Sequence, residues 1–190
     1  MSAQPNGTRR YRLATEESRF TVQAFAEGLF SGFGHNPVIA IREFAGEVEC
    51  APDNFDGSKL RVTVKADSLA VADNMSDKDR REIEQAMREQ VLETTRYPDI
   101  IFESTSFTAT PMSGGRSRVR VIGDLTLHGV NGKNIWIQAE VKPDGDGLRA
   151  KGEFTLRQTE YNIKPVSVAG GMLKVKNELK FSFDIKAVAD

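Results

Sequence analysis

The chain has 190 residues, of which 39% are hydrophobic, and its 26 basic and 27 acidic side chains give a net charge of -1. This length suits one domain, and the apolar share is large enough for a hydrophobic core, so disorder of the whole chain is excluded. The charge balance argues against a nucleic-acid-binding protein, which usually carries a basic excess. One cysteine and two histidines make an internal disulfide or a Cys/His zinc site unexpected.

The first residues are polar and differ in composition from the rest. We expect residues 1–8 to form a flexible tail in front of a single domain over residues 9–190. No apolar segment of the kind found in secretory signals follows Arg9 and Arg10, so a cytoplasmic location is predicted. No run of apolar residues is long enough for a transmembrane helix.

Alternation of apolar and polar residues predicts antiparallel strands with one buried and one solvated face. In the N-terminal half this alternation covers residues 19–24 and 60–65. Residues 38–50 also alternate, but their apolar positions change from odd to even numbers near Arg42 and Glu43. One extra residue would produce that change, so we predict a bulge or bend there.

One segment has helical periodicity instead. Between Ser76 and Thr95, apolar residues recur every three or four positions, as on one face of a helix. Ser76 is a suitable N-cap, and Pro98 forces the residue before it towards extended structure. The sequence therefore predicts an α-helix over about residues 77–95.

The C-terminal half is typical of a meander of neighbouring strands. Glycine-containing turns separate the alternating segments, at 114–115, 131–132 and 144–147. Roughly eight strands and one helix do not fit a parallel βαβ fold, whereas closure of the sheet would remove its exposed edges. The predicted fold class is therefore all-β, an antiparallel up-and-down barrel with one inserted helix.

Motifs of catalytic chemistry are scarce. His128 precedes Gly129, and a role in anchoring the turn is favoured over catalysis because no partner can be identified. His35 lies in a loop, where a capping role is favoured over contact with the head group of a ligand. Cys50 shares the parity of apolar residues, which favours a small core residue over a nucleophile.

The inward rows supply the candidate ligand contacts, since an eight-stranded barrel is either filled by side chains or holds one slender ligand. Asn177 shares the parity of the last strand's apolar row, and its amide either bonds a neighbouring backbone group or contacts a ligand. Phe30 and Phe33 lie in a Gly-rich loop, which either rims the mouth of the barrel or folds back as a plug. The remaining candidates are apolar: Phe20, Val22, Val62, Phe102, Leu125, Ile137, Phe154, Leu156, Phe181 and Phe183.

Several segments, in this order, resemble the YceI-like family of small bacterial lipocalin-like barrels that bind polyisoprenoids. Residues 44–48 (FAGEV) resemble the F-x-G-x-i step of that family, and residues 96–104 (RYPDIIFES) resemble its yP-x-i-x-F-x-S signature. Residues 123–130 (GDLTLHGV) resemble its G-x-L-T-l-x-G-v hairpin. Two segments depart from the pattern: Glu17-Ser18 replaces a common His-Ser pair, and the start of the helix lacks the D-x-H-L motif.

The resemblance implies a lipocalin-like barrel whose apolar tunnel holds an isoprenoid chain, such as a quinone tail or a prenyl phosphate. We therefore expect a non-enzymatic protein that binds, sequesters or transports such a ligand, with no cofactor besides a bound isoprenoid or fatty-chain lipid. A transient membrane contact and a homodimer are open partner hypotheses. Two alternatives stay open: a plugged barrel that acts as a stress-related or protein-interaction module, through Trp136 for example, and a lipid-modifying enzyme that uses His128 or His35.

Overall fold

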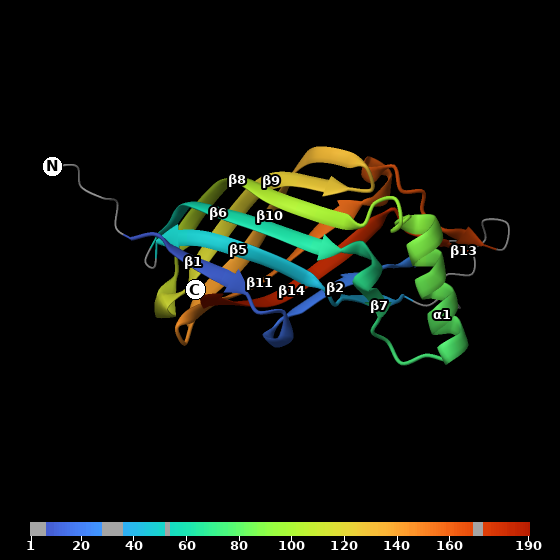
Figure 1. Ribbon diagram of the computed structural model, residues 1–190, viewed down its shortest axis with the longest axis horizontal. Helices are drawn as coiled ribbons and strands as arrows, with labels where there is room; N and C mark the ends of the chain where they lie inside the picture. Colours follow the sequence, from blue (N-terminus) through green and yellow to red (C-terminus); the bar gives the residue numbers. More distant parts are fainter. Residues whose placement is uncertain (1–6, 28–35, 52–53, 169–172) are drawn as a thin grey trace.

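Eight strands form a closed antiparallel barrel in the computed structural model, which describes residues 7–27, 36–51, 54–168 and 173–190. Each strand pairs with the next in the order β1-β5-β6-β8-β9-β10-β11-β14, and pairing of β1 with β14 closes the ring (Figure 1). The barrel strands are β1 (Arg9–Leu13), β5 (Phe44–Ala51), β6 (Asn54–Lys65), β8 (Asp99–Pro111), β9 (Ser117–Leu127), β10 (Val130–Asp144), β11 (Gly147–Arg157) and β14 (Glu178–Ala189). The predicted fold class is confirmed.

At one end of the barrel the sheet continues on other strands. The N-terminal half of β14 pairs with β2 (Arg19–Gln23), which pairs with β4 (Val38–Ile41), which pairs with β7 (Leu69–Val71). A small separate sheet is formed by β12 (Ser167–Val168), β13 (Leu173–Val175) and β3 (Ala26–Glu27). The wall of the barrel is therefore built from different strands at its two ends.

The change of strands takes place along a transverse bend, which we define by residues 14–18, 42–43 and 66–68. Here β1 gives way to β2, β4 to β5, and β6 to β7. The Thr15 hydroxyl donates to the Phe44 carbonyl at 2.7 Å, and the Glu43 amide donates to the Ser68 hydroxyl at 3.0 Å. The parity change near Arg42 and Glu43 is therefore a break between two strands rather than an extra residue inside one.

The helix is shorter than predicted. It consists of α1 (Asp77–Ala86) followed by a π-helical turn (Met87–Val91), and the predicted end at residue 95 is wrong. The Leu92 amide bonds the carbonyl five residues back, at 2.9 Å, and Glu93 then adopts a left-handed φ of 46°. The wider π turn and this backbone reversal end the helix, although the apolar spacing continues to Thr94.

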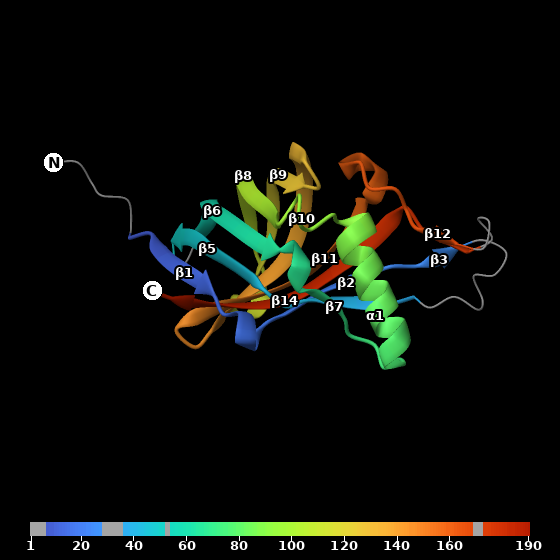
Figure 2. The same cartoon turned by 45° about the vertical axis from the view of Figure 1, so that its right-hand side comes forward.

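The α1 helix covers the free edge of β7 (Figure 2). The carboxylate of Glu84 accepts from the Val71 amide at 3.0 Å, and the Arg80 guanidinium donates to the Val71 carbonyl at 2.7 Å. These side chains take the place of a neighbouring strand, which satisfies the edge and prevents pairing with another chain. None of the described helices is long and apolar enough to cross a membrane.

The start of α1 gives a first testable expectation. The Ser76 hydroxyl accepts a hydrogen bond from the Asp79 amide at 3.1 Å, as predicted for an N-cap. Ser76→Ala should lower the free energy of unfolding by about 1 kcal/mol, since it leaves that amide without its partner. Urea denaturation measures the loss, and Ser76→Asp, which keeps a capping oxygen, should restore most of it. Equal stability of all three proteins would contradict the assignment of the cap.

Candidate functional site

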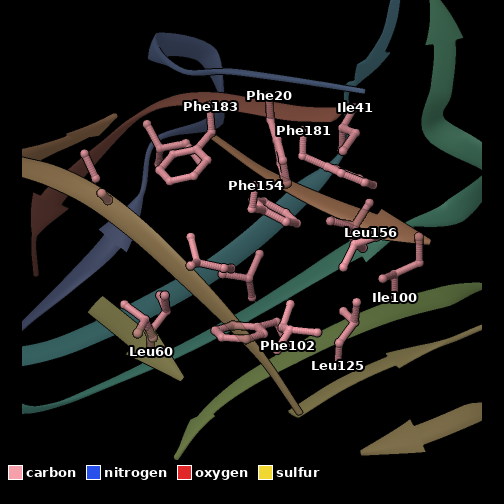
Figure 3. A pocket seen from close by; sticks show the side chains of 18 of the residues that line it. Phe20, Ile41, Leu60, Ile100, Phe102, Leu125, Phe154, Leu156, Phe181 and Phe183 are labelled. Atoms are coloured by element: carbon pink, nitrogen blue, oxygen red, sulfur yellow. The ribbon is translucent and has the colours of Figure 1, made fainter. Parts of the chain in front are cut away.

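The barrel encloses a cavity of about 260 Å³, and the residues that line it come from both ends of the barrel. The inward rows of the strands form its wall (Figure 3), and all the described lining residues are apolar except Gln158. Ten of the predicted residues line this cavity: Phe20, Val22, Val62, Phe102, Leu125, Ile137, Phe154, Leu156, Phe181 and Phe183. Such a surface offers no charge to a guest and suits an apolar chain.

Aromatic rings concentrate on the side of the cavity formed by β2, β11 and β14. The rings of Phe154 and Phe181 stack with centroids 4.7 Å apart and an interplanar angle of 10°. Phe20 meets Phe183 edge to face, with centroids 6.3 Å apart (Figure 3). Aromatic pairs in these geometries are favourable beyond the area that they bury. This side of the wall is therefore already packed in the structure.

The other walls are mostly aliphatic and differ from end to end. Phe102 and Leu125 lie opposite the aromatic cluster (Figure 3). Val91, from the π-helical turn, and Leu92, which follows it, join the wall at the helix end. The helix thus contributes side chains to the cavity besides covering β7, a role that its narrow apolar stripe did not predict.

Gln158 is the one polar side chain among the described lining residues, and it was not among the residues predicted from the sequence. It follows β11 directly, and it continues the even-numbered inward row that contains Phe154 and Leu156. The side chain is 5% exposed, and its amide nitrogen donates to the Lys176 carbonyl at 2.8 Å. The even-numbered parity of the strand therefore indicates that Gln158 lies in the inward row.

Asn177 lies outside the cavity wall, so the structure does not place it as a ligand contact. Its carbonyl oxygen accepts from the Thr159 amide at 3.0 Å, and its nitrogen donates to the Thr159 hydroxyl at 2.9 Å. These bonds fasten the start of β14 to the turn after β11, next to Gln158. Of the two alternatives for Asn177, the hydrogen bond to a neighbouring backbone group is the one present in the structure.

The remaining predicted loop residues cannot be placed on the cavity. Phe30, Phe33 and His35 lie outside the described residues. Their roles at the mouth of the barrel or as polar contacts stay predictions.

His128 lies in a hydrogen-bonded cluster away from the cavity wall. One ring nitrogen is 3.1 Å from the Tyr161 carbonyl, and the other is 2.8 Å from the Glu93 carboxylate. The Tyr97 ring packs against the imidazole with centroids 4.7 Å apart, and the backbone of His128 has a left-handed φ of 50°. These contacts join the end of the helix to the β9–β10 and β11 turns, as expected for a histidine that anchors a turn.

Two further residues singled out in the sequence have structural surroundings. Cys50 is 2% exposed, and burial raises the pKa of its thiol to about 11, so the thiolate form is suppressed at neutral pH. Trp136 is 62% exposed on the outer face of β10, with the Arg120 guanidinium 5.8 Å from its ring centroid. Over the described ranges, no group of three or more His, Cys, Asp or Glu side chains is placed to hold a metal ion.

Comparison with known proteins adds family membership to this geometry. The chain is 33% identical over 115 residues to a UPF0312 protein of Pseudomonas savastanoi, covering 57% of this chain and 54% of the relative. It is 28% identical over 131 residues to Protein YceI of Shigella flexneri, covering 65% and 61%. The matched region thus spans a little over half the length of these curated relatives.

Solved structures share the fold at low sequence identity. The structure of BcnA from Burkholderia cenocepacia superposes with a TM-score of 0.68 at 16% identity, over 93% of this chain and 99% of that one. A polyisoprenoid-binding domain from Saccharophagus degradans superposes with a TM-score of 0.69 at 14% identity, over 95% and 98%. The model of the YceI-like domain matches residues 11–187, nearly the whole length. The chain therefore belongs to the family of YceI-like domains.

Proposed function

We propose that this protein binds one long apolar chain of the isoprenoid class inside the barrel, and that it acts as a carrier or sequestering protein without catalysing a reaction. The observation that carries the proposal is the apolar cavity inside the barrel, which is lined by residues from both of its ends. Its volume of about 260 Å³ is close to the lower end of the range for ligand pockets, about 300–1,000 Å³, which suits a slender guest.

The energetics permit useful affinity. A buried methylene contributes about 0.8 kcal/mol, so a twenty-carbon chain would contribute on the order of 15 kcal/mol before costs. Association and ordering cost an estimated ~4–15 kcal/mol. The stacked rings of Phe154 and Phe181 lower the ordering cost, because this part of the wall does not have to form when the ligand binds. The isoprenoid class is further supported by the ligand named for the Saccharophagus domain.

The alternatives have less support. A plugged barrel would have its centre filled by side chains, whereas the described wall surrounds a cavity. A lipid-modifying enzyme using His128 would need that imidazole at the cavity, but both its nitrogens face Tyr161 and Glu93 instead. Binding of an apolar chain is therefore the function that this geometry favours.

Native mass spectrometry of freshly purified protein tests the proposal. We expect an adduct of several hundred daltons, which solvent extraction and fragmentation should identify as an isoprenoid. Protein that is stripped of lipid and refolded should rebind geranylgeraniol, a twenty-carbon prenyl alcohol. A bare chain that also fails to take up this probe would overturn the proposal.

A further inference from the structure

The lining of the cavity carries no charge, which bears on the head groups of the isoprenoids that it could hold. Every described lining residue is uncharged, and Gln158 is the single polar residue among them. A phosphate or diphosphate inside this cavity would lose its hydration without gaining a cationic partner, which is strongly unfavourable. An uncharged head group does not meet this penalty.

The carboxamide of Gln158 is oriented by its own hydrogen bond. The Lys176 carbonyl can only accept, so the side-chain atom 2.8 Å from it is the amide nitrogen, and the carbonyl oxygen Oε1 lies on the other branch. Among the described residues, no donor is bonded to Oε1. The unsatisfied atom at this point of the wall is therefore a hydrogen-bond acceptor.

The surrounding turn holds this acceptor in place through backbone hydrogen bonds. The backbone amide of Gln158 donates to the backbone carbonyl of Asn177 at 2.9 Å, and the backbone carbonyl of Gln158 accepts from the Ile163 amide at 3.1 Å. Asn177 is bonded in turn to Thr159, so both sides of the turn are fixed. A fixed polar group loses little freedom when it bonds a ligand, which favours specific recognition.

We propose that the occupant is an uncharged lipid with a hydroxyl group, of the prenyl-alcohol class, and that this hydroxyl donates to Oε1 of Gln158 at the helix end of the cavity. The inference rests on the proposed function, since it names the head group of the same ligand. A hydroxyl matches the free acceptor, whereas an ether or a quinone carbonyl has no hydrogen to donate.

The test compares three probes with one twenty-carbon chain: geranylgeraniol, its methyl ether, and geranylgeranyl diphosphate. The wild-type protein should bind the alcohol about fivefold more tightly than the ether, the effect of one neutral hydrogen bond. It should bind the diphosphate at least roughly tenfold more weakly than the alcohol, because the charged group must stay outside the apolar wall. Dissociation constants from fluorescence displacement measure both ratios.

The variant Gln158→Met should reduce the preference for the alcohol over the ether to about one, since methionine offers no comparable acceptor. Gln138→Met is the matched control, because Gln138 is exposed on the outer face of β10 and should leave the ratio unchanged. Thermal unfolding of both variants checks the fold. If Gln158→Met does not fold, the ratios of dissociation constants for the wild-type protein still decide which head group the cavity prefers.

The outcomes separate the two proposals. Equal binding of the alcohol and the diphosphate, or of the alcohol and the ether, would overturn the inference about the head group while the proposed function stands. Failure of all three probes to bind would instead overturn the proposed function.

Discussion

Phe181→Arg is expected to abolish retention of geranylgeraniol by this protein, whereas Ser182→Arg, one residue further along β14, is expected to leave it intact. The Phe181 ring lines the cavity and stacks on Phe154. A guanidinium at that position would bring charge and water into an apolar space without a counter-ion, at a cost of several kcal/mol. The apolar guest would then lose the surface that binds it. Retained ligand after gel filtration measures the effect.

The control variant Ser182→Arg introduces the same residue into the same strand, but on the opposite face. Ser182 lies on the outer face of the same strand, where its hydroxyl donates to the Glu153 carboxylate at 3.2 Å. An arginine there meets an acidic neighbour and solvent, and a surface substitution of this kind usually changes stability by less than about 0.5 kcal/mol. Folded Phe181→Arg protein that still retains the probe would contradict the assignment of the cavity as the binding site.

A second variant also tests whether the cavity is the binding site, but it introduces no buried charge. Ala150 lines the cavity on β11, and Ala150→Phe would add a ring to the space that the ligand needs. We expect loss of binding with at most a moderate loss of stability, about 1–3 kcal/mol, the usual cost of extra core volume. This variant decides the matter if Phe181→Arg fails to fold.

Much of this cavity could be predicted because strand periodicity records which face of a strand is buried. The odd row that contains Leu125 and the even row that contains Phe154 and Leu156 were both evident in the sequence, and both line the cavity. Each depends only on neighbours along one strand. The same parity extends to Gln158, so its place in the cavity wall could be predicted in the same way.

The transverse bend could not be predicted in full, because it depends on several strands together. One parity change near Arg42 and Glu43 was visible, but the breaks at residues 14–18 and 66–68 leave no comparable mark in the local pattern. They adjoin one another only after β14 has paired with β1 at one end and with β2 at the other. Periodicity gives the face of a strand and not its partners.

The end of the helix and the role of Asn177 illustrate the same limit. Apolar spacing extends to Thr94, whereas the backbone reverses at Glu93, whose carboxylate bonds His128 from a distant turn. Asn177 has inward parity, but its bonds to Thr159 hold it in the turn. In both cases a hydrogen bond between residues far apart in sequence outweighs the local pattern.

Gly123 is a glycine in an inward row, and the structure indicates why a larger residue does not fit there. A Cβ atom at this position would lie 2.5 Å from the Phe102 ring and would also collide with the Glu103 carbonyl of the neighbouring strand. The strand beside it is irregular at the same level, since the β8–β9 register shifts between Ser104 and Ser106. The Phe102 ring thus occupies the space that the missing side chain leaves.

Gly123→Ala should therefore lower the free energy of unfolding by about 2–3 kcal/mol, because backbone and ring must both move to admit one methyl group. The midpoint of urea denaturation should fall by about 1 M. Gly7→Ala makes the same change where a Cβ would meet nothing within 4 Å, and its midpoint should stay close to that of the wild-type protein. The displaced Phe102 ring would also narrow the cavity, so weaker binding of geranylgeraniol should accompany the loss of stability. Equal midpoints for the two variants would show that β8 and β9 can separate at low cost, and that the packing of Phe102 on Gly123 does not shape the cavity wall.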